Sequence, residues 1–536
     1  MRKQALLILA FLLIVSFLVA GCGQTEASKN PPPPASTSAV AGSQVKPVLG
    51  GTFKWAWKSG PTAFGLPLSA TGPSADTLSF TIQPLIRHTE KPGIYEPVLA
   101  ESWSFSSDKL SLTFNLRKGV KFHDGTPFNA DAVKWNHERL LASANPRLKM
   151  VKSIDVIDDY TIRYNLTYWN TLVLWDFTYG DAAGIISPTA FKEKGEDWCK
   201  INPVGTGPWK FQEYQRDTYI KFIKNPDYWD KTIPYLDFME LDKIADPLVL
   251  YASLIKGDVD GWREVDVDSA AQLTATGQYN IESISGGHMI LWYNNTDPAS
   301  PWSDVKMRQA LEYAIDKETI AKSLGKGFCD ATYEYVNDLE AVGGKSGTAP
   351  RKVDYVKAKE LLKAAGYPEG ISVNLSVNQK FNTPFVQALQ GSLAKAGIKV
   401  EIQVKTDAEW AALQLQPCIG SELRYDRQTG GGAGIVSTVN NDFTTKSIKF
   451  PAVVRPPGWQ EALDSLLIEE NSANIVTILT KMEKMAYDAA MFTPLWTNND
   501  LMAYSKNLKW DTSKRASIWT AAWRPTARLD LAWLQK

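Results

Sequence analysis

A strand–helix–strand pattern late in the chain constrains the fold more than any other stretch. In residues 371–377 and 398–404, apolar side chains alternate with polar ones, which predicts strands with one buried face. Between them, Leu389 and Leu393 lie at helical spacing, and Gly397 ends the predicted helix. Short connections on both sides of the helix make the two strands parallel with a right-handed crossover. This part of the chain is therefore predicted to be an α/β unit.

A second block, Leu99–Leu140, predicts a β-hairpin followed by a helix. Residues 110–117 alternate between apolar and polar side chains, and Gly119 allows the chain to reverse into a second strand at 120–122. A further turn leads to Asn129, whose side chain can cap the helix that follows. Strands on either side of an Asp-Asp turn at 158–159 complete a predicted strand-rich unit.

The N-terminus is interpreted as a targeting segment. Arg2 and Lys3 precede an apolar run over 5–19 that is short for a membrane span. Residues 18–22, Leu-Val-Ala-Gly-Cys, resemble a bacterial lipobox, which implies cleavage before Cys22 and lipid modification of its thiol. A plain secretory signal with a chance cysteine is the alternative. The Pro-rich and Ser-rich stretch that follows is predicted to be a disordered tether.

Length and charge narrow the class of protein. A chain of 536 residues suggests two or three domains. Lys and Arg number 58, equal to Asp and Glu at 58, and no basic tract indicates nucleic acid as a partner. After Cys22 only Cys199, Cys329 and Cys418 remain. An odd number allows one pair plus a free thiol or three free thiols, so no disulfide is assigned.

Motifs for catalysis or metal binding are missing from the sequence. The four histidines, His88, His123, His137 and His288, lie far apart, and neither HExxH nor a Cys/His metal spacing occurs. There is no G-x-S-x-G elbow. The sequence therefore disfavours an enzyme, and we expect no catalytic residue, no metal and no cofactor.

Several segments together resemble a known family. They are LRKGVKFHDGTPF at 116–128, NPVGTGPW at 202–209, NPDYW at 225–229 and a helix with Arg308, Asp316 and Lys317 in register. This set is similar to the family 5 (peptide/nickel/oligosaccharide-type, cluster C) extracellular solute-binding proteins of bacterial ABC importers, in their lipoprotein form. The resemblance implies a periplasmic-binding-protein-like α/β fold of type II, with two α/β lobes joined by a hinge plus an extra strand-rich domain.

The resemblance also implies an order of domains along the chain. It gives a lipoprotein signal peptide at 1–21, the lipidated cysteine and linker at 22–50, lobe I at 51–81, 203–290 and 497–536, the extra domain at 82–202, and lobe II at 291–496.

Ligand contacts are expected at positions in family-like segments, because Trp and Tyr offer rigid apolar area with a polar tip. Packing inside a large protein is the competing role for each aromatic residue. The expected contacts are Trp55, Trp57, Trp292, Asn294, Trp410, Arg424, Asp426 and Trp496.

The class of ligand stays open at this point. Peptide-binding relatives usually carry a proline-framed aspartate in lobe II that pairs with the amino terminus of the peptide, and residues 424–443 contain none. Asp426 or Asp442 could replace it, and Arg424 or Arg427 could instead pair with an anionic group.

The resemblance implies that lobe closure captures a small solute, such as an oligopeptide or oligosaccharide, and delivers it to ABC permease subunits. The protein is expected to be a monomer, held outside the cytoplasmic membrane by its lipid anchor, either periplasmic or at the cell surface. The alternatives are a surface-tethered hydrolase of peptides or glycans and a non-transport receptor with the same fold.

Overall fold

The computed structural model describes residues 46–535, apart from 71–72, 90–92, 144, 146, 179–182, 382, 429–433, 446, 448–449, 511–518, 522–523 and 528. The predicted signal peptide, Cys22 and most of the predicted tether lie outside the described residues. Residues Pro47–Lys536 form one compact unit. No helix in the described part of the chain is long and apolar enough to cross a membrane.

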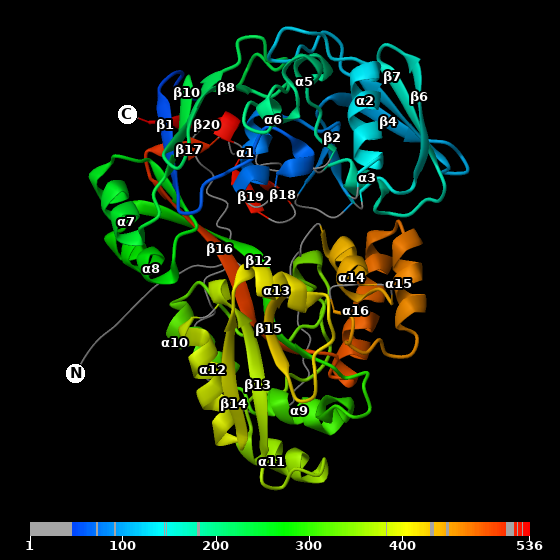
Figure 1. Cartoon of the computed structure of the whole chain (residues 1–536), viewed down its shortest axis with the longest axis vertical. Helices are drawn as coiled ribbons and strands as arrows, with labels where there is room; N and C mark the ends of the chain where they lie inside the picture. Colours follow the sequence, from blue (N-terminus) through cyan, green and yellow to red (C-terminus); the bar gives the residue numbers. More distant parts are fainter. Residues whose placement is uncertain are drawn as a thin grey trace, which may run out of the picture. The chain divides into compact units, whose positions relative to one another are not determined.

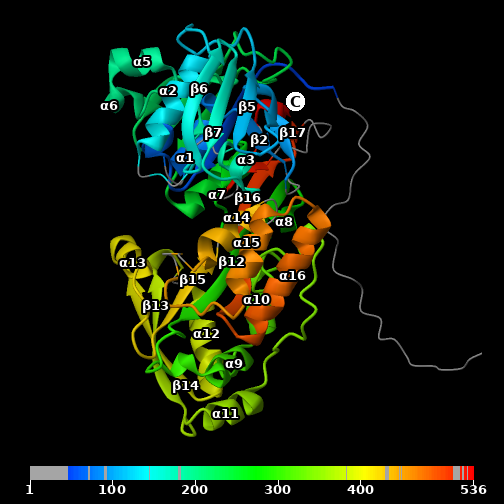
Figure 2. The same ribbon diagram turned by 90° about the vertical axis from the view of Figure 1, so that its right-hand side faces the viewer.

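A ten-stranded mixed sheet is the main element of this unit, and two long strands carry it from one half to the other (Figure 1). Its strands, in spatial order, are β14 (Ile398–Lys405), β13 (Ile371–Asn378), β15 (Leu423–Gln428), β12 (Tyr279–Tyr293), β16 (Thr493–Ser505), β11 (Gly261–Arg263), β1 (Thr52–Trp57), β10 (Phe238–Lys243), β9 (Tyr219–Lys224) and β8 (Trp209–Gln215). We call β11, β1, β10, β9 and β8, with the helices packed on them, the β1 half, and β14, β13 and β15, with the helices packed on them, the β15 half. Figures 1 and 2 both show β12 and β16 running through the region between the two halves.

Alternation along β1 sets the two faces of the β1 half. Phe53, Trp55 and Trp57 point to one face and join a core with β9, β10 and β16. Ala56 points to the other face, which is covered by α7 (Pro247–Lys256) and α8 (Val267–Thr276). Each of these helices begins at an aspartate cap and ends at a left-handed glycine, as expected for helix termini.

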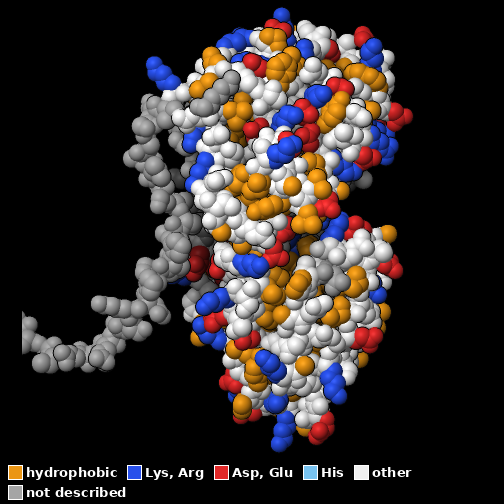
Figure 3. Space-filling model, turned by 90° about the vertical axis from the view of Figure 1, so that its left-hand side faces the viewer, with side chains coloured by type: hydrophobic (Ala, Val, Ile, Leu, Met, Phe, Trp, Pro, Cys, Tyr) orange, Lys and Arg blue, Asp and Glu red, His pale blue; other side chains and the backbone are white. Residues whose placement is uncertain are grey.

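Figure 3 views the molecule from the side that carries α7 and α8, at the left of Figure 1. Lys and Arg side chains are interspersed with Asp and Glu across this face. Hydrophobic side chains lie between them, and Leu248, Val249 and Ile255 of α7 are exposed.

The β15 half confirms the predicted strand–helix–strand unit. β13 and β14 pair in parallel from Ile371 and Ile398 onward, and α12 (Pro384–Lys395) connects them. The sheet is covered on both faces, because alternate residues of β12 enter two different cores. One core contains α9 (Val305–Tyr313), α10 (Lys317–Gly325), α11 (Tyr355–Ala364) and α12, and the other contains α14 (Ile435–Phe443), α15 (Trp459–Ile468) and α16 (Ser472–Asp488).

A separate four-stranded antiparallel sheet lies within residues 100–166, with the order β4 (Ala100–Phe105), β5 (Ser111–Leu116), β7 (Thr161–Leu166) and β6 (Val151–Asp158). The turn between β6 and β7 is confirmed, and Asn129 caps α2 (Ala130–Leu141) through a 3.0 Å bond from the Ala132 amide. The predicted pairing of 110–117 with 120–122 is wrong. β5 pairs with β4 and β7 instead, while Val120 and Phe122 turn their side chains into the core.

The remaining elements connect these layers. They are α1 (Pro73–Thr81), α3 (Val173–Asp176), α5 (Pro188–Lys194), α6 (Glu196–Cys199), α13 (Asp407–Gln414), β2 (Ile86–His88), β3 (Tyr95–Pro97), β17 (Leu508–Trp510), β18 (Trp519–Ala521), β19 (Arg524–Ala527) and β20 (Ala532–Leu534). Cys199, Cys329 and Cys418 are buried free thiols.

Candidate functional site

The two halves of the main sheet direct the carboxyl ends of their parallel strands toward each other. In the β1 half, β1, β10 and β11 are parallel and end side by side at Trp57, Lys243 and Arg263. In the β15 half, β13, β14 and β15 are parallel, and Gln428 at the end of β15 pairs with His288 in the middle of β12. Because β16 is antiparallel to both β11 and β12, both sets of ends point to the region where β12 and β16 pass from one half to the other. We call this region the crossing. In open α/β sheets, ligands bind outside the carboxyl ends of the strands.

The crossing itself is marked by a bulge. The register between β12 and β16 passes from Ser285 opposite Asn499 to His288 opposite Thr497, so Gly286 and Gly287 both stand against residue 498. A Cβ on Gly286 would lie 2.5 Å from the backbone oxygen of Asn498, and Gly287 has a φ of 106°. Only glycine fits both demands. The bulge therefore separates the part of β12 in the β1 half from the part in the β15 half.

On the side of the β1 half, Trp57 packs beside a buried ion pair. The guanidinium of Arg263 lies 4.9 Å from the centre of the Trp57 ring and pairs with the buried carboxylate of Asp76 on α1. Trp57 is only 2% exposed, yet its indole N–H has no hydrogen-bond partner among the described residues. A buried donor without a partner costs about 1–3 kcal/mol, and such a group is a candidate for ligand contact.

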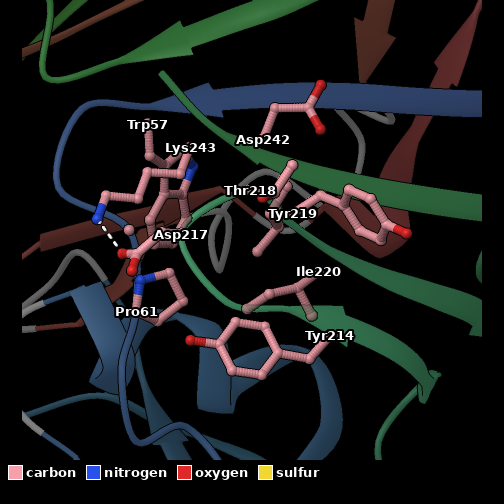
Figure 4. Close-up of a pocket in the computed structure, with 11 residues that line it drawn as sticks. Trp57, Pro61, Tyr214, Asp217, Thr218, Tyr219, Ile220, Asp242 and Lys243 are labelled. Carbon is pink, nitrogen blue, oxygen red and sulfur yellow. Dashed lines mark hydrogen bonds and ion pairs between the residues drawn. The ribbon is translucent and has the colours of Figure 1, made fainter. Parts of the chain in front are cut away.

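A pocket opens beside Trp57, at the carboxyl ends of β1 and β10 (Figure 4). Figure 4 shows Trp57 on one side, Tyr214 and Ile220 on the other, and Pro61 between them. Lys243 and Asp217 form an ion pair at its edge. The side chains of Asp242 and Tyr219 point away from this space. The walls are thus mostly aromatic and aliphatic, with charge at the rim.

The Tyr214 ring is fixed by a perpendicular contact with Phe64, whose ring centre is 5.1 Å away. Gly60 brings the loop after β1 against the Lys243 side chain, because a Cβ there would lie 3.0 Å from the Lys243 Cδ. Burial and the nearby Glu240 raise the pKa of Asp242 to about 6.

On the side of the β15 half, polar side chains gather where β15 ends. The Gln428 side chain is fully buried; its amide donates to the Tyr335 carbonyl at 3.4 Å, while its Oε1 has no partner among the described residues. Its cross-strand neighbour His288 places Nε2 3.7 Å from Oδ1 of Asp338. Burial raises the pKa of nearby Glu334 to about 7.

Arg427 lies at the bulge. Its Nη1 is 3.9 Å from Oδ1 of Asp500 on β16, and a Cβ on Gly286 would lie 3.3 Å from the same nitrogen. The Arg427 side chain is 21% exposed. Of the two arginines proposed for an anionic ligand, Arg427 is therefore the one beside the crossing.

Arg424 and Trp292, two other expected contacts, lie deeper in the β15 half. Arg424 is 1% exposed and donates to the carbonyls of Leu413, Gln416 and Pro417 and to both carboxylate oxygens of Glu422. The Arg424 guanidinium also lies 4.8 Å from the centre of the fully buried Trp292 ring. The Arg424 side chain thus ties β15, and the Trp292 ring on β12, to the end of α13 and the residues that follow it.

The other expected contacts also have protein partners. Asp426 accepts from the Gln414 amide at 2.8 Å, and Asn294 accepts from the backbone of Thr296 and Asp297. Trp55, Trp410 and Trp496 are 3%, 5% and 2% exposed, respectively. Their roles as ligand contacts stay predictions, and only Trp57 of this set lines the pocket.

Sequence reasoning missed Gly286, Gly287, Tyr214 and Lys243. The glycine pair stands one residue, His288, before the apolar run 289–293, which is a signal for a bulge within a strand. Tyr214 and Lys243 carry no such signal, because only the pairing of β8, β9 and β10 brings them to Trp57.

A second connection joins the antiparallel sheet unit to the β15 half. The Thr171 amide donates to the Leu467 carbonyl at 2.8 Å, and Lys109 forms a 2.7 Å ion pair with Glu470. Leu172 packs against the core that contains α15 and α16.

Comparison with known proteins identifies the family. A family model described as "Bacterial extracellular solute-binding proteins, family 5 Middle" matches residues 95–450. The chain belongs to this family. Its members bind solutes outside the cytoplasm and are not enzymes. Among described residues, no group of three or more His, Cys, Asp or Glu side chains is arranged to hold a metal ion.

Curated relatives include proteins named "Glutathione-binding protein GsiB". The one from Shigella flexneri serotype 5b is 32% identical over 439 residues, covering 77% of this chain and 82% of the relative. The one from Escherichia coli O157:H7 is also 32% identical, over 434 residues, with the same coverage. These two relatives support the family assignment over most of the chain.

Solved structures confirm the fold. The Helicobacter pylori periplasmic binding protein DppA, in complex with a peptide, is 23% identical and superposes with a TM-score of 0.73 over 91% of this chain and 99% of that one. The Bacillus subtilis oligopeptide-binding protein AppA, in complex with a nonapeptide, is 22% identical with a TM-score of 0.71, over 92% of this chain and 100% of that one. The predicted periplasmic-binding-protein fold with an extra antiparallel sheet is confirmed.

Proposed function

We propose that this protein is the solute-binding component of an ABC importer and that it binds a peptide-type solute, such as a short peptide or glutathione, by closure of the two halves. The solute would lie between the carboxyl ends of β1, β10 and β11 and those of β13 and β15. The relatives named as glutathione-binding support this class of solute.

The observation that carries the proposal is the pair of opposed strand ends joined by β12 and β16. A solute that contacts both sets of ends is held by contacts available only when the halves approach. Such a ligand shifts the equilibrium toward the closed form by its differential affinity for that form. The glycine bulge at 286–287 interrupts the ladder where a hinge is needed, and ABC permease subunits would then recognise the closed form.

The sequence at residues 18–22 supports attachment by a lipid on Cys22. Two acyl chains hold a protein stably on a bilayer, whereas one chain binds only marginally. We propose that the mature protein is a monomer without a cofactor that faces the outside of the cytoplasmic membrane.

Native mass spectrometry of gently purified protein, followed by calorimetric titration of the stripped protein, tests the proposal. We expect a co-purifying small peptide or thiol tripeptide, and binding of glutathione or tripeptides in the micromolar range or tighter. A co-purifying sugar or metal chelate, together with failure to bind any peptide, would contradict it. Turnover of a panel of fluorogenic peptide and glycoside substrates would instead favour the alternative function, a surface-tethered hydrolase of peptides or glycans.

A further inference from the structure

We infer that residues 168–172 of the antiparallel sheet unit, which we call the latch loop, dock onto the end of α15 when the two halves close and slow the release of the solute. The inference rests on the proposed function for the closing motion and for the solute. It assigns the antiparallel sheet unit a role in holding the closed form.

The latch loop contacts the β15 half through its tip. Leu172 packs against the core of the antiparallel sheet unit and also against the core that contains α14, α15 and α16. The Thr171 amide donates to the Leu467 carbonyl at 2.8 Å. Leu467 lies in the last turn of α15, where carbonyl groups have no partner within the helix. The tip therefore supplies both an apolar contact and a hydrogen bond to a helix end.

The antiparallel sheet unit is tied to the β1 half, so the two should move together. The His123 amide donates to the Gly205 carbonyl at 2.8 Å, and His123 Nε2 lies 3.0 Å from the Gly207 carbonyl oxygen. These glycines stand just before β8. The Arg117 guanidinium also lies 4.0 Å from the centre of the Trp229 ring. A rotation about the crossing would therefore carry the latch loop with the β1 half, toward α15 or away from it.

The latch loop keeps its shape through contacts within its own unit. Oδ1 of Asn170 accepts from the Leu172 amide at 3.0 Å. The Trp169 ring lies perpendicular to that of Phe105, with ring centres 6.4 Å apart, and Nζ of Lys109 lies 3.9 Å from the Trp169 ring centre. A loop that is already ordered loses little conformational entropy when it docks.

The position of the contact, away from the crossing, suits a latch. Figure 1 shows α3, which begins directly after the latch loop, facing α14 and α15 to the right of β12 and β16. A contact far from the hinge forms only after the halves have approached. It should therefore lower the dissociation rate constant and leave the association rate constant unchanged. The Lys109–Glu470 ion pair is largely exposed and contributes little, so Leu172 should carry most of the effect.

Hydrogen exchange tests the latch in the wild-type protein, because the Thr171 amide bonds across the halves. We would measure its exchange rate by mass spectrometry at residue resolution, with and without saturating glutathione. We expect exchange to slow at least about tenfold when glutathione binds. The Thr167 amide, which donates to the Met150 carbonyl within the antiparallel sheet unit, is the control and should not change. An equal Thr171 rate in the two states would overturn the latch and leave the proposed function intact.

A matched pair of variants tests the effect on release, followed by stopped-flow tryptophan fluorescence. Leu172→Ala should raise the dissociation rate constant of glutathione about fivefold to tenfold, with an unchanged association rate constant. Leu174→Ala makes the same change at a partly buried side chain of the antiparallel sheet unit, and it should leave both rate constants unchanged. Equal dissociation rate constants for the two variants would overturn the latch as well. Trileucine replaces glutathione as the probe if only trileucine binds.

Failure of both glutathione and trileucine to bind would contradict the proposed function, and the latch is then tested without solute. Exchange of the Thr171 amide should be faster in Leu172→Ala than in Leu174→Ala, because docking depends on Leu172. Equal exchange rates in these two variants would contradict the latch.

Discussion

The two halves of the main sheet contain the same pair of side chains in different settings. Arg263 lies 4.9 Å from the ring centre of Trp57 in the β1 half, and Arg424 lies 4.8 Å from that of Trp292 in the β15 half. Both indole N–H groups are buried without a partner among the described residues. Trp292, however, packs perpendicular to Phe450 inside a core, whereas Trp57 lines a pocket. An arginine stacked on a tryptophan therefore does not by itself show whether the tryptophan has a structural or a ligand-binding role. The surface beside the pair decides between the two roles.

The largest expected effect is that of Arg424→Ala. This change would leave Glu422 and three carbonyls without their buried donor, and breaking a buried ion pair costs about 3–5 kcal/mol. We expect urea denaturation to show a loss of that size. Arg216→Ala, at a side chain that is 83% exposed, is the control. A stable Arg424→Ala protein that has lost solute affinity would instead make Arg424 a binding residue and, like Arg263 beside Trp57, a neighbour of the solute.

The second effect contrasts the two tryptophans directly. Trp292→Phe should lower the free energy of unfolding by about 2 kcal/mol through the cavity it leaves, with unchanged solute affinity in the folded protein. Trp57→Phe should mainly change solute affinity. Paired denaturation and calorimetry check both variants. If Trp292→Phe and Trp57→Phe lost unfolding free energy and solute affinity in the same proportion, the two tryptophans would have the same role, contrary to this expectation.

A buried acid on α16 should make the stability of the protein depend on pH. Glu483 is fully buried and accepts from the amides of Tyr335 and Val336, and burial raises its pKa to about 7. An acid whose pKa is raised by folding contributes stability that is present below its unfolded pKa and lost as pH rises through its folded pKa.

Between about pH 4.5 and pH 7, the wild-type protein should lose up to about 3 kcal/mol through this group. Glu483→Gln keeps an acceptor without the charge, so the variant should lack this part of the pH dependence. Denaturation curves at several pH values measure the difference. Parallel pH profiles for the two proteins would mean that Glu483 does not take up a proton on folding.

The smallest effect concerns the contact between the antiparallel sheet unit and the β15 half. The Lys109–Glu470 pair is largely exposed, at 37% and 61%, and exposed pairs contribute about 0.2–1 kcal/mol. Glu470→Gln should therefore weaken solute binding less than about fivefold, and only at low salt. Glu461→Gln, on the preceding helix α15, is the control. A stronger effect that persists at high salt would place this contact among the main determinants of closure.

Local patterns predicted the local structure well. The parallel pair β13 and β14, the Asn129 cap and the β6–β7 turn all follow from residues close together in the chain. The pairing of 110–117 with 120–122 was wrong because β4 and β7 offer β5 longer ladders.

The candidate site was harder to predict because it depends on distant pairings. β12 meets β16 across more than 200 residues of sequence, as in the pair of Tyr279 with Ser505, and β10 brings Lys243 beside Trp57. Trp57 was expected as a ligand contact from its place in a family-like segment, but nothing near it in sequence shows that Tyr214 and Asp217 line the same space. The eight expected contacts therefore include one residue of the pocket, whereas Trp55, Trp292 and Trp496 lie in three different cores.

We expect the two halves to close about the crossing of β12 and β16 when solute binds. Spin labels at two exposed positions, Gln212 in the β1 half and Lys359 on α11, would report the distance between the halves by pulsed electron resonance. We expect a single shorter distance when saturating trileucine or glutathione is added to stripped protein, and a broader, longer distribution without solute. An unchanged distance distribution under conditions where calorimetry shows full occupancy would contradict the account.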